Sequence, residues 1–402
     1  MNKMLKMLNK NRRSHSFSVP FFFFLLLFWS GGGLFFLHAG QDWAIVDRPW
    51  SWLFPRDHGS HPEFQTEWWY FTGNLYGTKE EPFGFQWTLF RQGVFGSSPL
   101  KISRWALRDV YFAHFALSDI QRKKFYVYEK ADRGALGLAG ATVGDMGGWI
   151  RGWELKSKKS TESGSQEKFH ISAQEEAVGI DLELEAQKPP VLHGENGLSR
   201  KADQEGCASY YYSFSRLKTQ GLIRVSNKTW RILGTSWFDH EFTTHSLGKN
   251  EVGWDWFAIQ LDTDEELMLY CLRTREGGFD PNSGGTWIGK KAIRHLTLRD
   301  FKITPTAFWK SPHTAALYPA GWKVQLGDPE MEIEINPKMA DQELVLNQLG
   351  FLAYWEGAVS VKGKKENNPI HGEGYVELTG YAAPLQDYLG YSFTHAGPSF
   401  LK

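Results

Sequence analysis

Cysteine is scarce in this sequence, with only Cys207 and Cys271 among 402 residues. Small secreted domains that rely on disulfides carry many more, so a disulfide framework is excluded as the basis of the fold. Cys271 lies in the apolar run 267–272, which favours a buried thiol, although the two cysteines could pair in an oxidising compartment. The fold must therefore depend on packed cores, and a chain of this length can bury them in two or three domains.

Two motifs of enzyme active sites are also missing. The sequence contains no Gly-x-Ser-x-Gly nucleophile elbow and no glycine fingerprint of a dinucleotide site. A serine-triad hydrolase and a dinucleotide-dependent enzyme are therefore without support, and no cofactor is expected. His58, His61 and Glu67 could be interpreted as metal ligands, but their spacing fits no well-defined site and Gly59 indicates a turn. No metal is expected either.

Acidic residues are absent before residue 40, where five of the chain's 45 cations lie. The basic stretch is followed by the uncharged residues 20–37 and then by His38-Ala39-Gly40, which offers a small residue at a cleavage point. This layout is typical of an export signal, so residues 1–39 are predicted to be a cleaved signal peptide and the mature protein to be periplasmic or secreted. The alternative is an uncleaved anchor in the inner membrane, because roughly 20 apolar residues span a bilayer.

The net charge without residues 1–39 is negative, because 40 cations remain against 45 anions. A nucleic acid attracts the opposite balance, since Lys and Arg must neutralise its phosphates. No nucleic-acid partner is therefore expected.

Helical periodicity is scarce, and apolar residues alternate with polar ones along much of the chain. Residues 83–89, 180–184 and 331–335 are apolar at every second position, which marks half-buried antiparallel strands. The 41 glycines and the aromatic content of 15% also suit strands and tight turns. The sequence predicts an all-β protein of sandwiches or barrels, with one short helix over residues 342–352.

Some stretches are instead apolar or aromatic at both odd and even positions. These stretches are residues 67–76, 110–117, 208–214 and 254–261. They suit strands with one face on a core and the other on a lined cavity or a second domain. A change of domain near residues 238–248 predicts an N-terminal domain over 40–242 and a C-terminal domain over 243–402. Residues 188–206 form a long connection, a kind of segment that is often functional.

Seven blocks between about residues 50 and 385 resemble one family of proteins. The blocks are residues 55–75, 188–194, 210–213, 237–242, 253–256, 354–357 and 374–381. They resemble the secreted lipocalin-like proteins grouped with carotenoid 1,2-hydratases (hydroxyneurosporene synthases) and with the AttH protein. The resemblance implies two lipocalin-like antiparallel β-barrels packed side by side. It also implies a large apolar ligand and no cofactor.

Hydration of an unactivated alkene requires an acid, a wall that tolerates a carbocation, and a base that positions water. A carboxylic acid in an apolar pocket keeps its proton near neutrality, and aromatic faces stabilise a passing cation. Asp239, His240 and Asp255 lie in segments rich in Trp and Phe and are the catalytic candidates. Because burying three unpaired ionisable groups is costly, we expect them to hydrogen-bond together at one polar spot beside an apolar pocket. The alternative is that these carboxylates cap turns or clamp the two domains together.

Strand alternation limits which side chains can share that pocket. It places Asp239 and Glu241 on one side with His240 on the other, and it separates Asp255 from both neighbouring Trp rings. The candidates for the ligand-binding wall are Glu67, Trp69, Tyr70, Trp237, Trp254 and Trp256. For the aromatic strand around Trp69 the alternative is an ordinary buried core.

Two functions remain open from the sequence. The first is an extracytoplasmic protein that binds a large apolar molecule, an isoprenoid or a lipid, and acts on it as a cofactor-independent hydratase-type lyase. The second is a non-catalytic carrier or chaperone that serves a membrane transporter. Ionisable groups on the pocket wall favour the enzyme, and a wall of rings alone favours the carrier. A third interpretation is that the aromatic residues only bury the contact between the two domains.

Overall fold

The computed structural model describes residues 43–94, 108–158, 166–245, 247–248, 250–348 and 350–385. These residues form twenty-five β-strands and one short 3-10 helix, η1 (Arg56–His58). The prediction of an all-β protein is confirmed. The predicted signal peptide or anchor, residues 1–39, lies outside the described residues, and within the described part no helix is long and apolar enough to cross a membrane.

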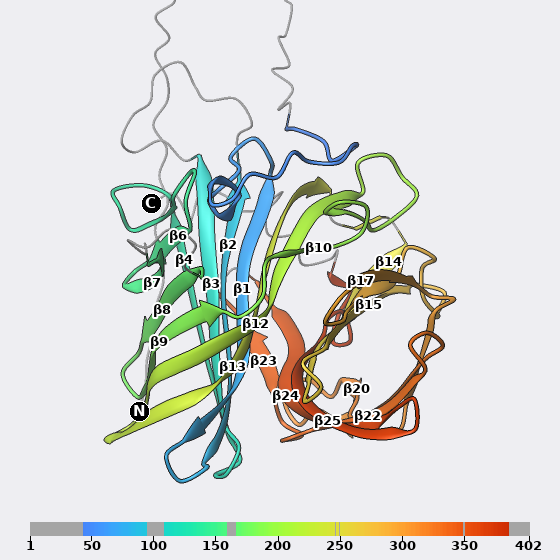
Figure 1. The fold of residues 1–402 in the computed structure, drawn as a ribbon. Helices are drawn as coiled ribbons and strands as arrows, with labels where there is room; N and C mark the ends of the chain where they lie inside the picture. The colour runs from blue at the N-terminus through green and yellow to red at the C-terminus, as the bar shows by residue number, and fades with distance from the viewer. Residues whose placement is uncertain are drawn as a thin grey trace, which may run out of the picture. The chain divides into compact units, whose positions relative to one another are not determined.

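The first sheet is antiparallel and follows the order β4-β3-β2-β1-β13-β12-β9-β8-β7-β6-β5, with β10 and β11 paired to β12 (Figure 1). Its strands are β1 (Thr66–Gly77), β2 (Pro82–Gly93), β3 (Asp109–Asp119), β4 (Lys124–Arg133), β5 (Ala139–Ala141), β6 (Gly147–Ile150), β7 (Trp153–Ser157), β8 (Lys168–Gln174), β9 (Val178–Ala186), β10 (Val191–Leu192), β11 (Leu198–Arg200), β12 (Ala208–Val225) and β13 (Lys228–His245).

The second sheet is also antiparallel and follows the order β17-β16-β15-β14-β25-β24-β22-β21-β18, with β23 paired to β24. Its strands are β14 (Glu251–Leu261), β15 (Glu266–Thr274), β16 (Gly284–Ile288), β17 (Ile293–Thr297), β18 (Phe301–Pro305), β21 (Trp322–Leu326), β22 (Met331–Pro337), β23 (Glu343–Leu346), β24 (Leu352–Lys365) and β25 (Asn368–Leu378). A separate hairpin joins β19 (Phe308–Lys310) to β20 (Leu317–Pro319).

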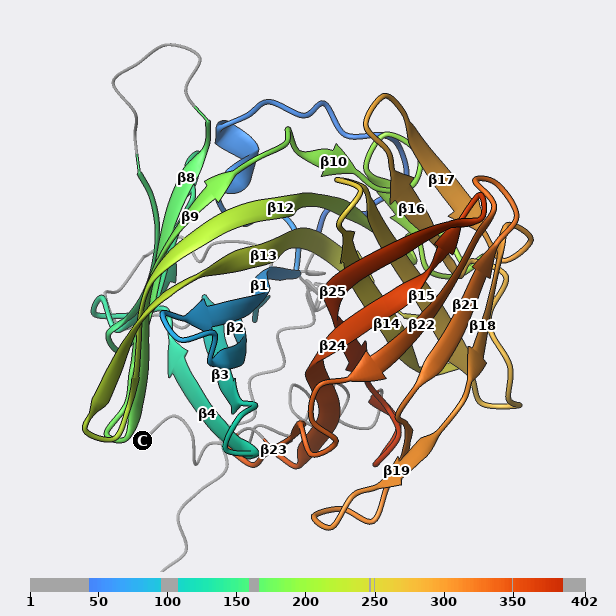
Figure 2. The ribbon, with the colours of Figure 1, turned by 60° about the horizontal axis from the view of Figure 1, so that its bottom comes forward.

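The alternation in the sequence determines which face of each strand is buried. In β9, Ile180, Leu182 and Leu184 point into the core of the first sheet, and Asp181 and Glu183 point to solvent. In β22 the alternate apolar residues enter a separate core enclosed by the second sheet. Each sheet curls around its own core. The strands of the second sheet surround a common interior in Figure 1, and the curl of the first sheet from β8 to β4 is seen in Figure 2. The two sheets form two lipocalin-like barrels.

The helix predicted over residues 342–352 is wrong. This segment contains β23 and the start of β24, which pair with each other in antiparallel register. Leu344 and Leu346 are two residues apart and pack on Ala116 and Tyr354, so the apolar spacing suits a strand on the first barrel. Packing against strands distant in the sequence overrides the local helical pattern.

The two barrels touch through a core of their own. Tyr70, Tyr211 and Trp237 of the first sheet pack in one buried cluster with Trp256 and Ala358 of the second. This contact explains the stretches that are apolar at both odd and even positions, because one face of each strand meets its barrel core and the other meets the partner barrel. Both cysteines are buried free thiols, so the prediction of a buried Cys271 is confirmed.

Candidate functional site

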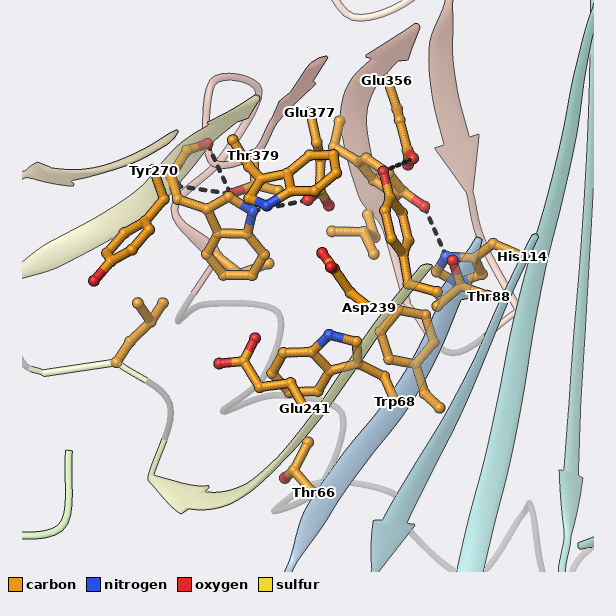
Figure 3. Close-up of a pocket in the computed structure, with 18 of the residues that line it drawn as sticks. Thr66, Trp68, Thr88, His114, Asp239, Glu241, Tyr270, Glu356, Glu377 and Thr379 are labelled. Atoms are coloured by element: carbon orange, nitrogen blue, oxygen red, sulfur yellow. Dashed lines mark hydrogen bonds between the residues drawn. The ribbon is translucent and has the colours of Figure 1, made fainter. Parts of the chain in front are cut away.

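A cavity lies where the two barrels meet, and strands of both sheets line it (Figure 3). The volume of the cavity is about 180 Å³. The first barrel contributes residues of β1, β2, β3, β12 and β13, and the second contributes residues of β14, β15, β24 and β25. A site at such a contact draws its groups from both sheets, and the interface between two barrels is a common location for ligand pockets.

The walls of the cavity are largely aromatic. Trp68 and Phe90 come from the first barrel and Trp254 and Trp256 from the second. Tyr70 meets Trp256 edge to face across the contact, with ring centroids 5.3 Å apart and planes at 90°. Faces of this kind attract apolar ligands and also stabilise positive charge.

Asp239 of β13 is the acidic group at the centre of this site, and Figure 3 places its carboxyl group between Trp68 and Glu377. Its Oδ1 accepts a hydrogen bond from Trp237 Nε1 at 2.6 Å and another from the Ser213 hydroxyl. Its Oδ2 accepts a hydrogen bond from the Tyr211 hydroxyl at 2.8 Å. Burial nevertheless raises the pKa of Asp239 to about 7, because no cation in the described part of the chain offsets the desolvation. Both the acid and the carboxylate are therefore populated near neutrality.

Two further buried carboxyl groups face the cavity from the second barrel. Glu356 of β24 and Glu377 of β25 are direct cross-strand partners, so both side chains point the same way. Tyr70 donates its hydroxyl hydrogen bond to Glu356, and Trp254 Nε1 donates one to Glu377 at 2.9 Å. Burial raises the pKa of Glu377 to about 7, and it raises the pKa of Glu356 well above the ordinary range. Glu356 Oε2 has no hydrogen-bond partner within the described part of the chain.

The remaining polar groups lie towards the sides of the cavity. His114 Nδ1 lies 2.8 Å from the hydroxyl of Tyr354, and burial lowers the pKa of His114 to about 3, so its imidazole is neutral. Lys201 Nζ pairs with Glu241 at 3.0 Å and lies over the ring of Tyr270 at 4.8 Å from its centroid. Among the residues that the structure describes here, the site contains the Lys201–Glu241 pair beside a group of acids with no cation as a close partner.

Comparison with known proteins assigns the chain to a family. The model of the AttH-like family matches residues 45–381. This protein belongs to the AttH-like family. The family resemblance found in the sequence is confirmed.

Solved structures with the same fold extend this comparison. An AttH protein from Nitrosomonas europaea is 32% identical, covers 84% of this chain and 99% of its own, and has a TM-score of 0.74. Kievitone hydratase from Nectria haematococca is 15% identical, covers 83% of this chain and 93% of its own, and has a TM-score of 0.64. No functionally curated protein matches the chain.

In this AttH-like protein the three catalytic candidates do not gather at one spot. Asp239 faces the cavity, whereas His240, its neighbour on β13, points into the first barrel. There His240 stacks on Trp69 at 4.9 Å, and its Nε2 lies 3.0 Å from Glu67 Oε1. Asp255 points into the second barrel, away from Trp254 and Trp256. The expectation that the three groups hydrogen-bond together is wrong, because adjacent strand residues face opposite sides.

Asp255 has partners of its own instead. Its carboxylate accepts hydrogen bonds from Arg273 Nε at 3.0 Å and from the Tyr381 hydroxyl at 3.0 Å. Burial raises its pKa to about 6, and the Arg273 charge limits that rise. Asp255 thus joins β14, β15 and the segment after β25 inside the second barrel, as a structural clamp would.

Glu67 and Trp69 also belong to the interior of the AttH-like first barrel and not to the cavity. Both oxygens of Glu67 are occupied, by Ser60 Oγ at 2.8 Å, Arg91 Nε at 3.0 Å, His61 Nδ1 at 2.9 Å and His240 Nε2 at 3.0 Å. Although burial opposes it, hydrogen bonds with Asp57 and Glu67 raise the pKa of His61 to about 9. This network ties η1 and the following segment to the barrel.

The same network holds three residues that, among those the structure describes, are placed close enough together to bind a metal. One ligand atom from each of His61, Glu67 and His240 lies within 4.8 Å of the others. Their mutual hydrogen bonds already satisfy the three atoms, and Arg91 supplies a charge that opposes a bound cation. The donor set therefore fits a hydrogen-bonded structural cluster better than a metal centre.

The sequence prediction of the binding wall is divided by the structure. Tyr70, Trp254 and Trp256 line the cavity. Trp237 does not line it but donates a hydrogen bond to Asp239, which does. Sequence reasoning missed Glu356 and Glu377 as site residues, although both lie in blocks that carry the family resemblance. The signal that could have identified them is an acidic residue at a buried position of an otherwise apolar strand.

Proposed function

We propose that this protein binds a large apolar, unsaturated molecule in the cavity between its barrels and adds water to it as a cofactor-independent hydratase. The observation that carries the proposal is Asp239, a buried acid whose pKa of about 7 lets it hold a proton inside an aromatic cavity. The fold it shares with a kievitone hydratase supports this class of reaction at the level of fold.

The residues present can carry each step of such an addition. Asp239 donates its proton to one alkene carbon, and the π electrons of the double bond form the new C–H bond. The positive charge left on the second carbon lies against the faces of Trp68 and Trp254. The oxygen of a water molecule bonds to that carbon, and its surplus proton passes to Glu377 as carboxylate. The sum is one water molecule added across one double bond.

A non-catalytic carrier that serves a membrane transporter is the second candidate. The aromatic wall favours it, because rings alone provide affinity for an apolar ligand. A carrier has no need for three buried carboxyl groups, each of which costs free energy to desolvate. The acids therefore favour the enzyme.

Exchange of Asp239 for Asn separates these two functions. Mass spectrometry of molecules co-purified with the protein first supplies the ligand, and binding and turnover are then measured for Asp239→Asn and for Asp255→Asn. Both substitutions keep shape and remove a buried acid with a raised pKa, but only Asp239 faces the cavity. We expect Asp239→Asn to retain binding and to lose about 100-fold or more of the turnover, the usual scale for a general acid.

The matched control decides what a loss of turnover means. Asp255→Asn should leave turnover close to that of the unsubstituted protein once folding is verified. Equal turnover in the two variants would remove Asp239 from the mechanism. Binding without any turnover in the unsubstituted protein would establish the carrier.

A further inference from the structure

A chain of hydrogen-bonded side chains connects Asp239 to the surface of the second barrel. His295 on β17 is exposed, and its Nδ1 lies 3.4 Å from Thr286 Oγ1 on β16. Thr286 Oγ1 lies 2.8 Å from Nδ1 of His193, and His193 Nε2 lies 2.7 Å from Ser213 Oγ. Ser213 then donates to Asp239 Oδ1. Thr286, His193 and Ser213, which lie between His295 and Asp239, are completely buried.

We propose that His295, Thr286, His193 and Ser213 form a proton path that restores the proton of Asp239 from solvent while ligand fills the cavity. The proposal rests on the proposed function, in which Asp239 gives up a proton at each turnover. The ligand and the one reacting water then occupy the cavity, and in this proposal bulk solvent does not reach Asp239 from that side. A second route through the protein removes this obstacle.

The order of donors and acceptors suits transfer in one direction. His295 donates from Nδ1 to the Thr286 hydroxyl, which donates to Nδ1 of His193. His193 donates from Nε2 to Ser213, and Ser213 donates to the Asp239 carboxylate. His193 must be neutral for this arrangement, and its complete burial lowers its pKa well below the ordinary value.

The transfer is balanced at every link. A proton from solvent binds His295 at Nε2, and its Nδ1 proton passes to Thr286 Oγ1 as the Thr286 proton passes to His193 Nδ1. The Nε2 proton of His193 passes to Ser213 Oγ as the Ser213 proton passes to Asp239 Oδ1. One proton enters from solvent and one arrives on Asp239. Rotation of the two hydroxyl groups, the return of the His193 proton to Nε2 and the exchange of the His295 proton from Nε2 to Nδ1 through solvent restore the starting arrangement.

The position of His193 argues against a role in packing alone. It follows β10, in the long connection 188–206, and reaches across the contact between the barrels to β16. A histidine buried there costs free energy in desolvation, and an apolar residue would join the barrels at a lower cost. Both ring nitrogens have hydroxyl partners, so each side of the ring contacts a group that can donate and accept a proton.

Charged groups near the path act differently on its middle and on its buried end. Lys201 and His295 are the groups whose charges act on His193, and both disfavour an imidazolium there. At the other end, Asp239 faces Glu241 and Glu377, which disfavour its ionised form and draw a proton towards it. A proton is thus repelled from the middle of the path and attracted to its end.

The experiment follows deuterium entering the Asp239 carboxyl group and requires no turnover. The full-length protein, its cavity filled with N-phenyl-1-naphthylamine as a neutral apolar probe, is mixed into D₂O below pD 6. The carboxylic acid C=O band of Asp239, identified by its loss in Asp239→Asn, is followed by infrared spectroscopy. We expect Thr286→Val to slow the exchange by about 100-fold, the lower range for loss of a positioned proton donor.

Two variants distinguish a proton path from a structural contact. Thr219→Val removes a different buried threonine hydroxyl, which is hydrogen-bonded to Ser236 and lies outside the path, and it should exchange at the unsubstituted rate. His295→Gln, at an exposed position, should exchange slowly and recover when imidazole is added to the buffer. Unsubstituted rates in both Thr286→Val and His295→Gln would overturn the path, and slow exchange without imidazole rescue would assign the residues to structure. Neither result depends on whether Asp239→Asn loses turnover, so the two proposals fail separately.

Discussion

At the scale of single residues, burial and partners decide what a carboxyl group can do. Asp239 and Asp255 both lie in aromatic strands and both have raised pKa values. Asp255 is paired with Arg273, whereas Asp239 has only neutral donors and lies among other acids. The first arrangement fixes a charge in place for the fold. The second leaves a group that can gain and lose a proton near neutrality, as a general acid must.

The pH dependence of stability should report Asp239 directly. Its pKa rises from 3.8 in the unfolded chain to about 7 in the folded protein, so between these values the folded state binds the additional proton. The contribution of Asp239 to the free energy of unfolding is complete below about pH 4. It is lost as the pH rises to 7, at about 1.4 kcal/mol per pH unit. We expect Asp239→Asn to remove this part of the slope.

Urea unfolding at pH 5 and pH 7.5 measures the effect. From pH 5 to pH 7.5 the unsubstituted protein should lose about 2–3 kcal/mol more of its free energy of unfolding than Asp239→Asn loses. Glu377 contributes a slope to both proteins through its own burial, and this part cancels in the comparison; the part that the Asp239 charge adds to the pKa of Glu377 is lost with Asp239 and belongs to the measured difference. Identical losses in the two proteins would mean that Asp239 is ionised throughout this range.

At the scale of secondary-structure elements, the approach of β2 to β24 and β25 sets the walls of the site. Gly84 of β2 lies in this contact, where an added Cβ would come within 2.8 Å of the Ala358 Cβ and 2.9 Å of the Tyr375 hydroxyl. Glycine in a strand is otherwise unfavourable, so its presence here is explained by the close approach of the second barrel.

Gly84→Ala should therefore be destabilising, although alanine normally suits a strand better than glycine does. We expect a loss of about 1–3 kcal/mol in the free energy of unfolding, the usual cost of overpacking. Gly327→Ala is the matched control, because no atom lies within 4 Å of its added Cβ. Urea unfolding compares the two, and equal stabilities would show that the strands separate easily.

At the scale of the whole molecule, the site depends on two barrels that pack against each other and enclose the cavity between them. The location of the protein belongs to this scale and is predicted from the sequence alone. The basic and apolar layout of residues 1–39 predicts that the mature protein begins near Gly40, outside the cytoplasm. N-terminal sequencing of protein from its native compartment checks this prediction, and an intact Met1 there would indicate a membrane anchor.

The sequence alone determined the strands and their faces. Period-two patterns such as residues 180–184 predicted the all-β fold, and the same rule separated Asp239 from His240 and Asp255 from its Trp neighbours. These inferences succeed because the side-chain direction in a strand depends only on local backbone geometry. The helix over residues 342–352 failed because pairing with β24 is not a local property.

Only the tertiary structure decided which faces meet. Asp239 lies on a first-barrel strand, and Glu356 and Glu377 lie more than a hundred residues later on two strands of the second barrel, yet all three line one cavity. His193 likewise joins Thr286 and Ser213 across the contact between the barrels. Strand register and barrel packing bring these residues together, and both arise from contacts between segments distant in the sequence. A pattern of neighbours along the chain contains the direction of each side chain but not its partner in space.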